Sequence, residues 1–352
     1  MTSASPMELR LAFIGLGNVA RAFARMIDDR RDQLSDGYGL KLRTTAIATG
    51  SHGCVLSDGD IDLRAAAACV ERGEPLTGLP GVAAISDTSG LIDRCEADVV
   101  FETTPLNPTD GEPAATYILN ALGRGMNVVT ANKGPVAFAY RRLKALAERK
   151  RVSFRFEGTV MDGAPVFNLV EYCLPVARVI RFSGVLNSTT NLILAGMESG
   201  RTFDECLDEA RRLGIAETNA DYDIDGWDAA AKAIVLANVL MGADLRPNDV
   251  DRAGIRDLDS RETQAAAAAG RPLRLIARAE GSGDGAKIVV GPERVAAASP
   301  LGSVRGTSNV LIIETDLMGE LVIFETNPGI EQTAYALLSD LIRVHEEAKS
   351  RR

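Results

Sequence analysis

The first third of the chain alternates short apolar runs with segments of helical periodicity. Residues 9–30, LRLAFIGLGNVARAFARMIDDR, start with an apolar run, break at glycines and resume with apolar positions at helical spacing. This pattern predicts a strand, a tight turn and a helix. Further strand-like runs lie at 42–50, 81–86, 97–105, 126–134 and 152–158, alternating with helical patterns such as 110–125 and 138–150. The alternation predicts an α/β fold with a doubly wound parallel sheet.

The pattern changes after about Val152. Residues 184–242 read as strand, turn, helix, short helix, acidic loop and a long helix. A chain of 352 residues is too long for one ordinary core. We therefore expect a first domain over residues 1–150 and a second, α+β domain over residues 151–329.

The turn at the end of the first predicted strand has the form Gly-x-Gly-x-x-Ala, with Gly15, Gly17 and Ala20 at the fixed positions. In a dinucleotide-binding turn the first glycine makes the bend and the second lets a pyrophosphate approach the backbone. The small third residue packs helix on strand, and the helix N-terminus, here Asn18 and Val19, offers N–H groups to the phosphates. The turn predicts a Rossmann-type domain that binds NAD or NADP.

The end of the second predicted strand bears on the choice between these cofactors. NAD-binding domains usually carry an Asp or Glu there for the ribose hydroxyls. This chain has Thr-Gly-Ser-His, with Ser51 and His52 where a 2′-phosphate could be tolerated but no adjacent arginine to clamp it. The sequence mildly favours NADP and leaves use of both cofactors open.

Two further segments lie where parallel strands should end. Thr103 and Thr104 follow the apolar run at 97–102, and Lys133 follows the run at 126–130. Ligands of open α/β sheets bind at the carboxyl ends of the strands, which makes these residues site candidates. A surface lysine is the alternative for Lys133.

The segment ETNADYDIDGWDAAAKAIVLANVLMG places five carboxylates in its first dozen residues, from Glu217 to Asp228. Lys232 then stands alone in an apolar run, four residues after Asp228 and on the same helical face. An apolar environment favours a neutral amine and nearby carboxylates favour the ammonium, and this balance can suit a lysine to general acid catalysis. The carboxylates could recognise a substrate ammonium group; a solvated loop is the alternative reading.

Composition excludes several other functions. A net charge of −9 argues against a nucleic-acid surface, and no apolar run has the length of a membrane span. Two histidines and five cysteines without metal-ligand spacing leave little material for zinc or histidine chemistry, so proton transfer falls to Lys, Asp, Glu or Tyr. The N-terminus lacks a signal-peptide core, and we expect a cytoplasmic protein.

These motifs together resemble the homoserine dehydrogenase family, in the short form without an aspartate kinase or regulatory domain. The matching pieces are GLGNVA, TPLNPTDGEPA, VVTANKGP, EGTVMDGAPV, GVLNSTTNLIL, GIAETNADYDIDGWDAAAK and SPLGSVRGTSNVLIIETDLMGE. The resemblance covers nearly the whole chain. It implies NAD(P)-dependent hydride transfer between L-homoserine and L-aspartate 4-semialdehyde, and hence threonine and methionine biosynthesis.

The resemblance also implies roles for single residues. Thr104 and Lys133 match residues at the nicotinamide end of the cofactor. Gly329, in the loop before the last helix, is also assigned to cofactor binding. Gly214, Glu217, Asp223 and Asp228 match the substrate site, and Lys232 matches the lysine that gives a proton to the carbonyl. Lys133 is a rival for that role, and the sequence leaves the two lysines unranked.

A monovalent-cation loop is a further implication. Its positions correspond to Glu157, Val160, Asp162 and Ala164, where backbone carbonyls would hold Na⁺ or K⁺. Asp162 departs from the small residue usual at its position.

Two other segments depart from the family pattern. Ser188 replaces the glycine of Asn-Gly-Thr-Thr, and Asn327-Pro328-Gly329 replaces a Gly-Ala-Gly loop. Each is either a tolerated loop variant or a sign of a reshaped pocket.

Alternatives follow from these departures: a relative acting on another small hydroxy- or amino-acid, or a dinucleotide sensor without catalysis. The resemblance further implies that the last helix, about 330–352, packs back on the first domain and that the protein is a homodimer.

Overall fold

The computed structural model describes residues 7–216, 219–282 and 285–351. The chain forms two compact units: unit 1 comprises residues 1–163 and 329–352, and unit 2 comprises residues 164–328. The division follows Gly163 rather than residue 150, because residues 154–155 still add a strand to the first sheet. In the part of the chain that the structure describes, no helix is long and apolar enough to cross a membrane.

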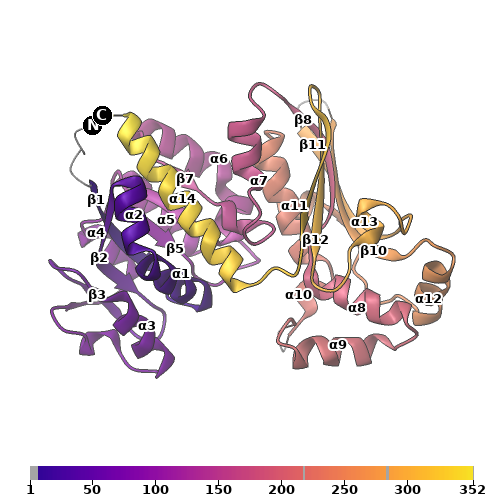
Figure 1. Ribbon diagram of the computed structural model, residues 1–352, viewed down its shortest axis with the longest axis horizontal. Coiled ribbons are helices and arrows are strands. Elements are labelled where there is room, and N and C mark those ends of the chain that lie inside the picture. Colours follow the sequence, from indigo (N-terminus) through magenta and orange to yellow (C-terminus); the bar gives the residue numbers. More distant parts are fainter. Residues whose placement is uncertain (1–6, 217–218, 283–284, 352) are drawn as a thin grey trace. The chain divides into compact units, whose positions relative to one another are not determined.

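Unit 1 is built on a seven-stranded sheet with the strand order β4-β3-β2-β1-β5-β6-β7. Figure 1 labels β1, β2, β3, β5 and β7 of this sheet. The strands are β1 (Met7–Ile14), β2 (Leu40–Ala48), β3 (Cys54–Leu56), β4 (Ala83–Ile85), β5 (Val99–Glu102), β6 (Asn127–Thr130) and β7 (Phe154–Arg155). Strands β2, β1, β5, β6 and β7 are parallel to their neighbours in that order, which confirms the Rossmann-type core.

One edge of this sheet differs from its parallel core. Strands β3 and β4 pair antiparallel, β3 with β2 and β4 with β3. Only residues 49–53 separate β2 from β3, which is too short for the crossover that parallel neighbours need. The strand β3 has only three residues, which is too short to show a periodicity, so the sequence did not predict it.

Seven helices flank this sheet in the described part of unit 1: α1 (Asn18–Asp29), α2 (Arg31–Tyr38), α3 (Leu63–Glu71), α4 (Thr88–Arg94), α5 (Ala114–Gly123), α6 (Lys133–Lys150) and α14 (Ile330–Ser350). The rings of Phe13 on β1, Phe23 on α1 and Phe101 on β5 form one aromatic cluster, with centroids 4.7 to 6.1 Å apart. Leu337 and Leu341 of α14 are buried in the same core. The C-terminal helix therefore completes unit 1.

Unit 2 is built on a six-stranded sheet with the order β13-β12-β8-β10-β11-β9. Its strands are β8 (Val179–Val185), β9 (Asp251–Arg252), β10 (Leu273–Ser282), β11 (Gly285–Arg294), β12 (Asn309–Thr315) and β13 (Gly319–Glu325). The pairings are antiparallel except that of β9 with β11. This sheet and its helices give the α+β unit that the sequence predicted.

The helices of unit 2 are α7 (Val166–Asn168), α8 (Ser188–Glu198), α9 (Phe203–Arg212), α10 (Asp221–Ile224), α11 (Trp227–Leu240), α12 (Ser260–Ala268) and α13 (Pro300–Ser303). Helix α11 packs on β10 and β11, and most of its residues are buried. Its many alanines suit this close packing on a sheet. The predicted acidic loop contains the short helix α10, which positions part of the acidic segment just before α11.

Candidate active site

Gly15 makes the turn between β1 and α1. Its φ of +93° favours glycine, and a Cβ there would lie 2.7 Å from the carbonyl oxygen of Thr103. The Thr103 hydroxyl donates to the carbonyl of Gly15 at 3.0 Å. The turn after β1 is therefore fastened to the loop after β5.

Gly17 has a different function in the same turn. Its φ is −75°, and a Cβ built on it would meet nothing within 4 Å. The backbone is thus open to a ligand at the N-terminus of α1, whose first turn carries no acidic residue. Ala20 is fully buried and brings α1 close to the sheet. These features fit a dinucleotide pyrophosphate, which is held by backbone N–H groups.

The segment after β2 carries Ser51 exposed and His52 partly buried. The backbone N–H of His52 donates to the Thr49 hydroxyl at 2.8 Å, which folds the segment into a compact turn. No carboxylate occurs between Ala48 and Gly53. The turn therefore lacks the acid that would bind a ribose 2′-hydroxyl.

The loops after β5 and β6 are joined by a residue that the sequence analysis did not single out. Glu102, the last residue of β5, is fully buried. Its carboxylate accepts hydrogen bonds from the backbone N–H and hydroxyl of Thr104 and from the hydroxyl of Thr130. Burial raises the pKa of Glu102 above its usual value, while the bonds from the two threonines lower it in part.

Lys133 is the first residue of α6 and is partly buried. Asn132 caps this helix: its Oδ1 accepts the N–H of Gly134 at 3.0 Å, and its own N–H donates to the Thr130 hydroxyl at 3.0 Å. Lys133 thus begins a capped helix directly after a strand, at the edge of the sheet where Thr104 also lies.

In unit 2, the partly buried Lys232 and the buried Asp228 form an ion pair on α11. Their side chains are 15% and 9% exposed, and Lys232 Nζ lies 3.2 Å from Asp228 Oδ2. The same Nζ donates to the backbone carbonyl of Leu186, after β8, at 2.7 Å. The spacing of four residues places both groups on one face, as the sequence predicted.

Asn187 links two carboxylates of this cluster. Its Nδ2 donates to Asp223 Oδ1 at 2.7 Å and to Asp228 Oδ2 at 2.9 Å. Its Oδ1 accepts the N–H of Thr190 at 2.8 Å and so caps α8. One amide therefore fixes the helix start and keeps two acids at a defined separation.

The electrostatics of the cluster are dominated by burial. Burial and the charge of Asp228 raise the pKa of Asp223, while Asn187 and Lys232 lower it in part. Burial and both carboxylates also raise the pKa of the Tyr222 phenol above its usual value. With both acids ionised, two carboxylates face one ammonium, which suits the binding of a further cation such as a substrate ammonium group.

The two other predicted substrate residues, Gly214 and Glu217, precede Asp223 in the sequence. The Thr189 hydroxyl donates to the carbonyl of Ile215 at 3.3 Å, which ties the start of α8 to the segment after Gly214. Gly214 is exposed and has a φ of +70°. Glu217 lies outside the described residues.

The two departures from the family pattern meet at one loop of unit 2. The Ser188 hydroxyl donates to the carbonyl of Thr307 at 2.7 Å, and the hydroxyl of Thr307 lies 3.5 Å from Asn327 Oδ1. Asn327 has a φ of +46°, a conformation that asparagine tolerates better than most residues. Gly329 belongs to unit 1, where it precedes α14.

The positions of the expected cation loop are distributed over the end of unit 1 and the start of unit 2. Glu157 and Val160 are buried, and Asp162 accepts a hydrogen bond from the Thr333 hydroxyl at 3.2 Å. Ala164 is the first residue of unit 2. Over residues 7–216, 219–282 and 285–351, no group of three or more His, Cys, Asp or Glu side chains could hold a metal ion.

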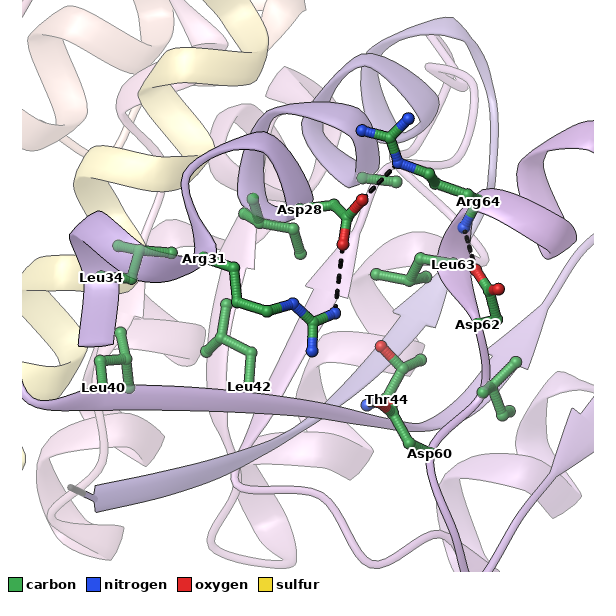
Figure 2. Close-up of a pocket in the computed structure, with 13 residues that line it drawn as sticks. Asp28, Arg31, Leu34, Leu40, Leu42, Thr44, Asp60, Asp62, Leu63 and Arg64 are labelled. Carbon is green, nitrogen blue, oxygen red and sulfur yellow. Dashed lines mark hydrogen bonds and ion pairs between the residues drawn. The ribbon is translucent and has the colours of Figure 1, made fainter. Parts of the chain in front are cut away.

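A separate cavity of about 300 Å³ lies beside the C-terminal end of α1 (Figure 2). Its charged groups already have partners. Arg31 and Arg64 bind Asp28, Asp60 accepts the N–H of Thr44, and Asp62 caps α3. The nucleotide turn lies at the other end of α1, so we assign no part of the active site to this cavity.

The comparisons with known proteins agree with this geometry. Residues 165–342 match the family model described as homoserine dehydrogenase, and residues 15–157 match the model for its NAD-binding domain. The chain is 35% identical to the NAD(+)-dependent homoserine dehydrogenase of Pseudomonas canavaninivorans, over 97% of both chains. It is 36% identical to the homoserine dehydrogenase of Methanocaldococcus jannaschii, over 96% of this chain and 99% of that one.

The fold comparison gives the same result. A hyperthermophilic archaeal homoserine dehydrogenase solved in complex with NADPH superposes with a TM-score of 0.82 at 29% identity, covering 97% of this chain and 98% of the other. The nucleotide turn, the lysine–carboxylate cluster and these matches lead to one conclusion. The chain belongs to the homoserine dehydrogenase family of NAD(P)-dependent oxidoreductases that act on a CH–OH group.

Proposed function

We propose that the chain interconverts L-homoserine and L-aspartate 4-semialdehyde through the residues described above. The buried pairing of Lys232 with Asp228, beside the Asn187-bridged Asp223, is the observation that carries the assignment of the substrate site. The carboxylates bind the substrate ammonium group, and Lys232 Nζ exchanges a proton with the substrate oxygen. A partly buried lysine in a fixed orientation can do this without a histidine.

Gly15, Gly17 and the N–H groups at Asn18, Val19 and Ala20 hold the pyrophosphate of the dinucleotide, and Thr103, Thr104 and Gly329 contribute to the same binding surface. When bound, the nicotinamide supplies or accepts the hydride. Thr104 and Lys133 orient its reactive end. Lys133 is the alternative proton carrier, since it begins α6 directly after the loop that follows β6.

NADP is the favoured cofactor in this proposal. The turn after β2 lacks a carboxylate, and the exposed Ser51 with its neighbour His52 leaves room for a 2′-phosphate. The relative from P. canavaninivorans is named as NAD(+)-dependent, and the archaeal structure contains NADPH, so both preferences occur among similar proteins.

A homodimer is supported by the second sheet. Val322 and Phe324 on β13 are 45% and 46% exposed and lie on one face with Ile312 of β12. Exposed apolar side chains that are adjacent on a sheet favour association with a second surface. We further propose that backbone carbonyls of residues 157–164 hold a monovalent ion, Na⁺ or K⁺, because this segment matches the cation loop of the family.

The test of this function is turnover by the purified protein. Oxidation of NADPH and NADH is followed with aspartate 4-semialdehyde, and the reverse reaction with homoserine and a panel of other small hydroxy-amino acids. We expect homoserine and the semialdehyde to give the highest kcat/KM. Tight cofactor binding without turnover of any of them would support a dinucleotide sensor instead.

A further inference from the structure

We propose that Glu102 is a positioning residue whose carboxyl ties together the two loops that present Thr104 and Lys133. The inference rests on the proposed function in one respect, the placement of these two residues at the nicotinamide end of the cofactor. Glu102 is fully buried at the end of β5, and the proposed chemistry gives it no other use.

The two oxygens of this carboxyl serve different loops. Oε1 accepts the backbone N–H of Thr104 at 2.9 Å and the Thr104 hydroxyl, both in the loop after β5. Oε2 accepts the Thr130 hydroxyl, at the end of β6, at 2.8 Å. Because Glu102 and Thr130 are direct partners of the parallel pair β5–β6, one side chain spans both strand ends.

Hydrogen bonds extend from Thr130 toward the lysine. Thr130 Oγ1 accepts the N–H of Asn132 at 3.0 Å, and Asn132 Oδ1 accepts the N–H of Gly134 at 3.0 Å. These bonds fix the first turn of α6, where Lys133 is the first residue. Loss of the Glu102 carboxyl therefore affects the loop of Thr104 directly and the helix of Lys133 through Thr130 and Asn132.

The sheet itself does not require an acid at this position. The other three residues of β5, Val99, Val100 and Phe101, are apolar and buried, and an apolar residue would continue that pattern. Burial of a carboxyl is unfavourable, as the raised pKa of Glu102 reflects. A costly polar group at the carboxyl end of a strand is typical of a ligand-binding position.

The test compares two ligands that differ at the nicotinamide end. In the proposed complex NADP⁺ contacts both the pyrophosphate turn and the loops that Glu102 holds, whereas 2′-phospho-ADP-ribose lacks the nicotinamide that would reach these loops. Dissociation constants for both are measured by calorimetry with wild type, Glu102→Ala, Glu102→Gln and Thr130→Val. The control is Thr45→Val, which removes another buried hydroxyl, bonded to the carbonyl of Glu96 at 3.0 Å.

We expect Glu102→Ala to raise the dissociation constant of NADP⁺ by about tenfold. The dissociation constant of 2′-phospho-ADP-ribose should change by less than about twofold. Glu102→Gln keeps an acceptor for the Thr104 N–H, so its loss of NADP⁺ affinity should be smaller than that of Glu102→Ala. Thr130→Val should show the same selective effect, and Thr45→Val should leave the ratio of the two constants unchanged.

Hydrogen exchange followed by mass spectrometry gives a readout without cofactor or turnover. Amides in peptides covering 103–111 and 130–138 should exchange faster in Glu102→Ala than in wild type, with peptides of β1 unchanged. Should Glu102→Ala fail to fold, Glu102→Gln and Thr130→Val provide the same comparison.

Equal weakening of both ligands, or an unchanged ratio in the Glu102 and Thr130 variants, would overturn the inference. Wild-type turnover is measured separately and reports on the proposed function. A selective loss of NADP⁺ affinity in a protein without homoserine turnover would therefore contradict that function but support the positioning role.

Discussion

Lys232 Nζ lies 3.2 Å from Asp228 Oδ2, one turn earlier on α11, and both side chains are largely removed from solvent. Lys232 also donates to the carbonyl of Leu186, so the position of its ammonium is set by two elements of unit 2. A buried ion pair of this kind contributes little net stability by itself, because desolvation offsets the attraction. Its value here lies in holding a proton donor at one place.

Lys232→Met should lower kcat by roughly 10²–10⁴-fold, the usual contribution of general acid catalysis. It should also destabilise the fold by about 3–5 kcal/mol, because Asp228 would remain buried without its cation. Lys232→Arg keeps the charge but not the readily released proton, and should restore stability more than kcat. Steady-state kinetics and urea unfolding measure the two effects.

Lys133→Met provides the comparison that ranks the two lysines. If Lys232→Met keeps full activity and Lys133→Met loses it, the proton passes through Lys133 and the proposed assignment is wrong. If Lys133 only orients the nicotinamide, its loss should raise the cofactor KM more than it lowers kcat.

Asn187→Ala should lower the unfolding free energy by about 1 kcal/mol through loss of the α8 cap. It should also raise the KM for homoserine, because Asp223 and Asp228 lose the amide between them. Thr202→Ala removes the cap of α9 in the same unit and serves as the control. Equal KM values in the two variants would argue that Asn187 is only a cap.

The two glycines of the nucleotide turn should respond differently to alanine. Gly15→Ala adds a Cβ at positive φ and 2.7 Å from the Thr103 carbonyl oxygen, and should cost about 1–3 kcal/mol of stability. Gly17→Ala has free space and should change stability by less than about 0.5 kcal/mol, yet weaken the dinucleotide by about tenfold. Thermal unfolding and calorimetry test this contrast, which fails if Gly17→Ala binds cofactor normally.

The stability of the protein should depend on pH through Asp223. Burial and Asp228 raise its pKa in the folded state above the ordinary value of 3.8. Between these two values the folded state binds more protons than the unfolded state, so the unfolding free energy falls as pH rises. Asp223→Asn should remove this slope, and its stability relative to wild type should therefore improve with increasing pH. Urea unfolding at several pH values tests this; parallel curves would contradict it.

Ser51→Asp should shift the cofactor preference toward NAD. A carboxylate at this exposed position would repel the 2′-phosphate of NADP and accept a bond from the ribose hydroxyl of NAD. We expect NADP affinity to fall by about tenfold. Ser199→Asp adds the same charge at an exposed serine of unit 2 and should alter neither affinity. An unchanged NADP affinity in Ser51→Asp would place the ribose elsewhere.

Features that depend on local spacing were predictable from the amino-acid pattern. Gly15 and Gly17 predicted the nucleotide turn because a tight turn is formed by residues that are adjacent in the sequence. The spacing of four residues between Asp228 and Lys232 likewise placed both side chains on one face of a helix. Strand-like apolar runs that alternate with helical patterns predicted the parallel core of unit 1, because each pattern is set by neighbouring residues. The assignment of α14 to unit 1 came from the family resemblance rather than from a local pattern.

Contacts between residues far apart in the chain could not be predicted from the pattern and became visible in the folded structure. Glu102 contacts a threonine 28 positions away, and Asn187 contacts Asp228 over 41 positions. In the sequence, Glu102 ends an apolar run and Asn187 precedes a helix, so neither shows what it binds. The antiparallel edge of the first sheet likewise depends on the pairing of β3 and β4 across 26 residues, from Leu56 to Ala83, rather than on periodicity. A hydrogen bond between two strands or two helices depends on how these elements pack together. The local sequence pattern therefore does not predict it.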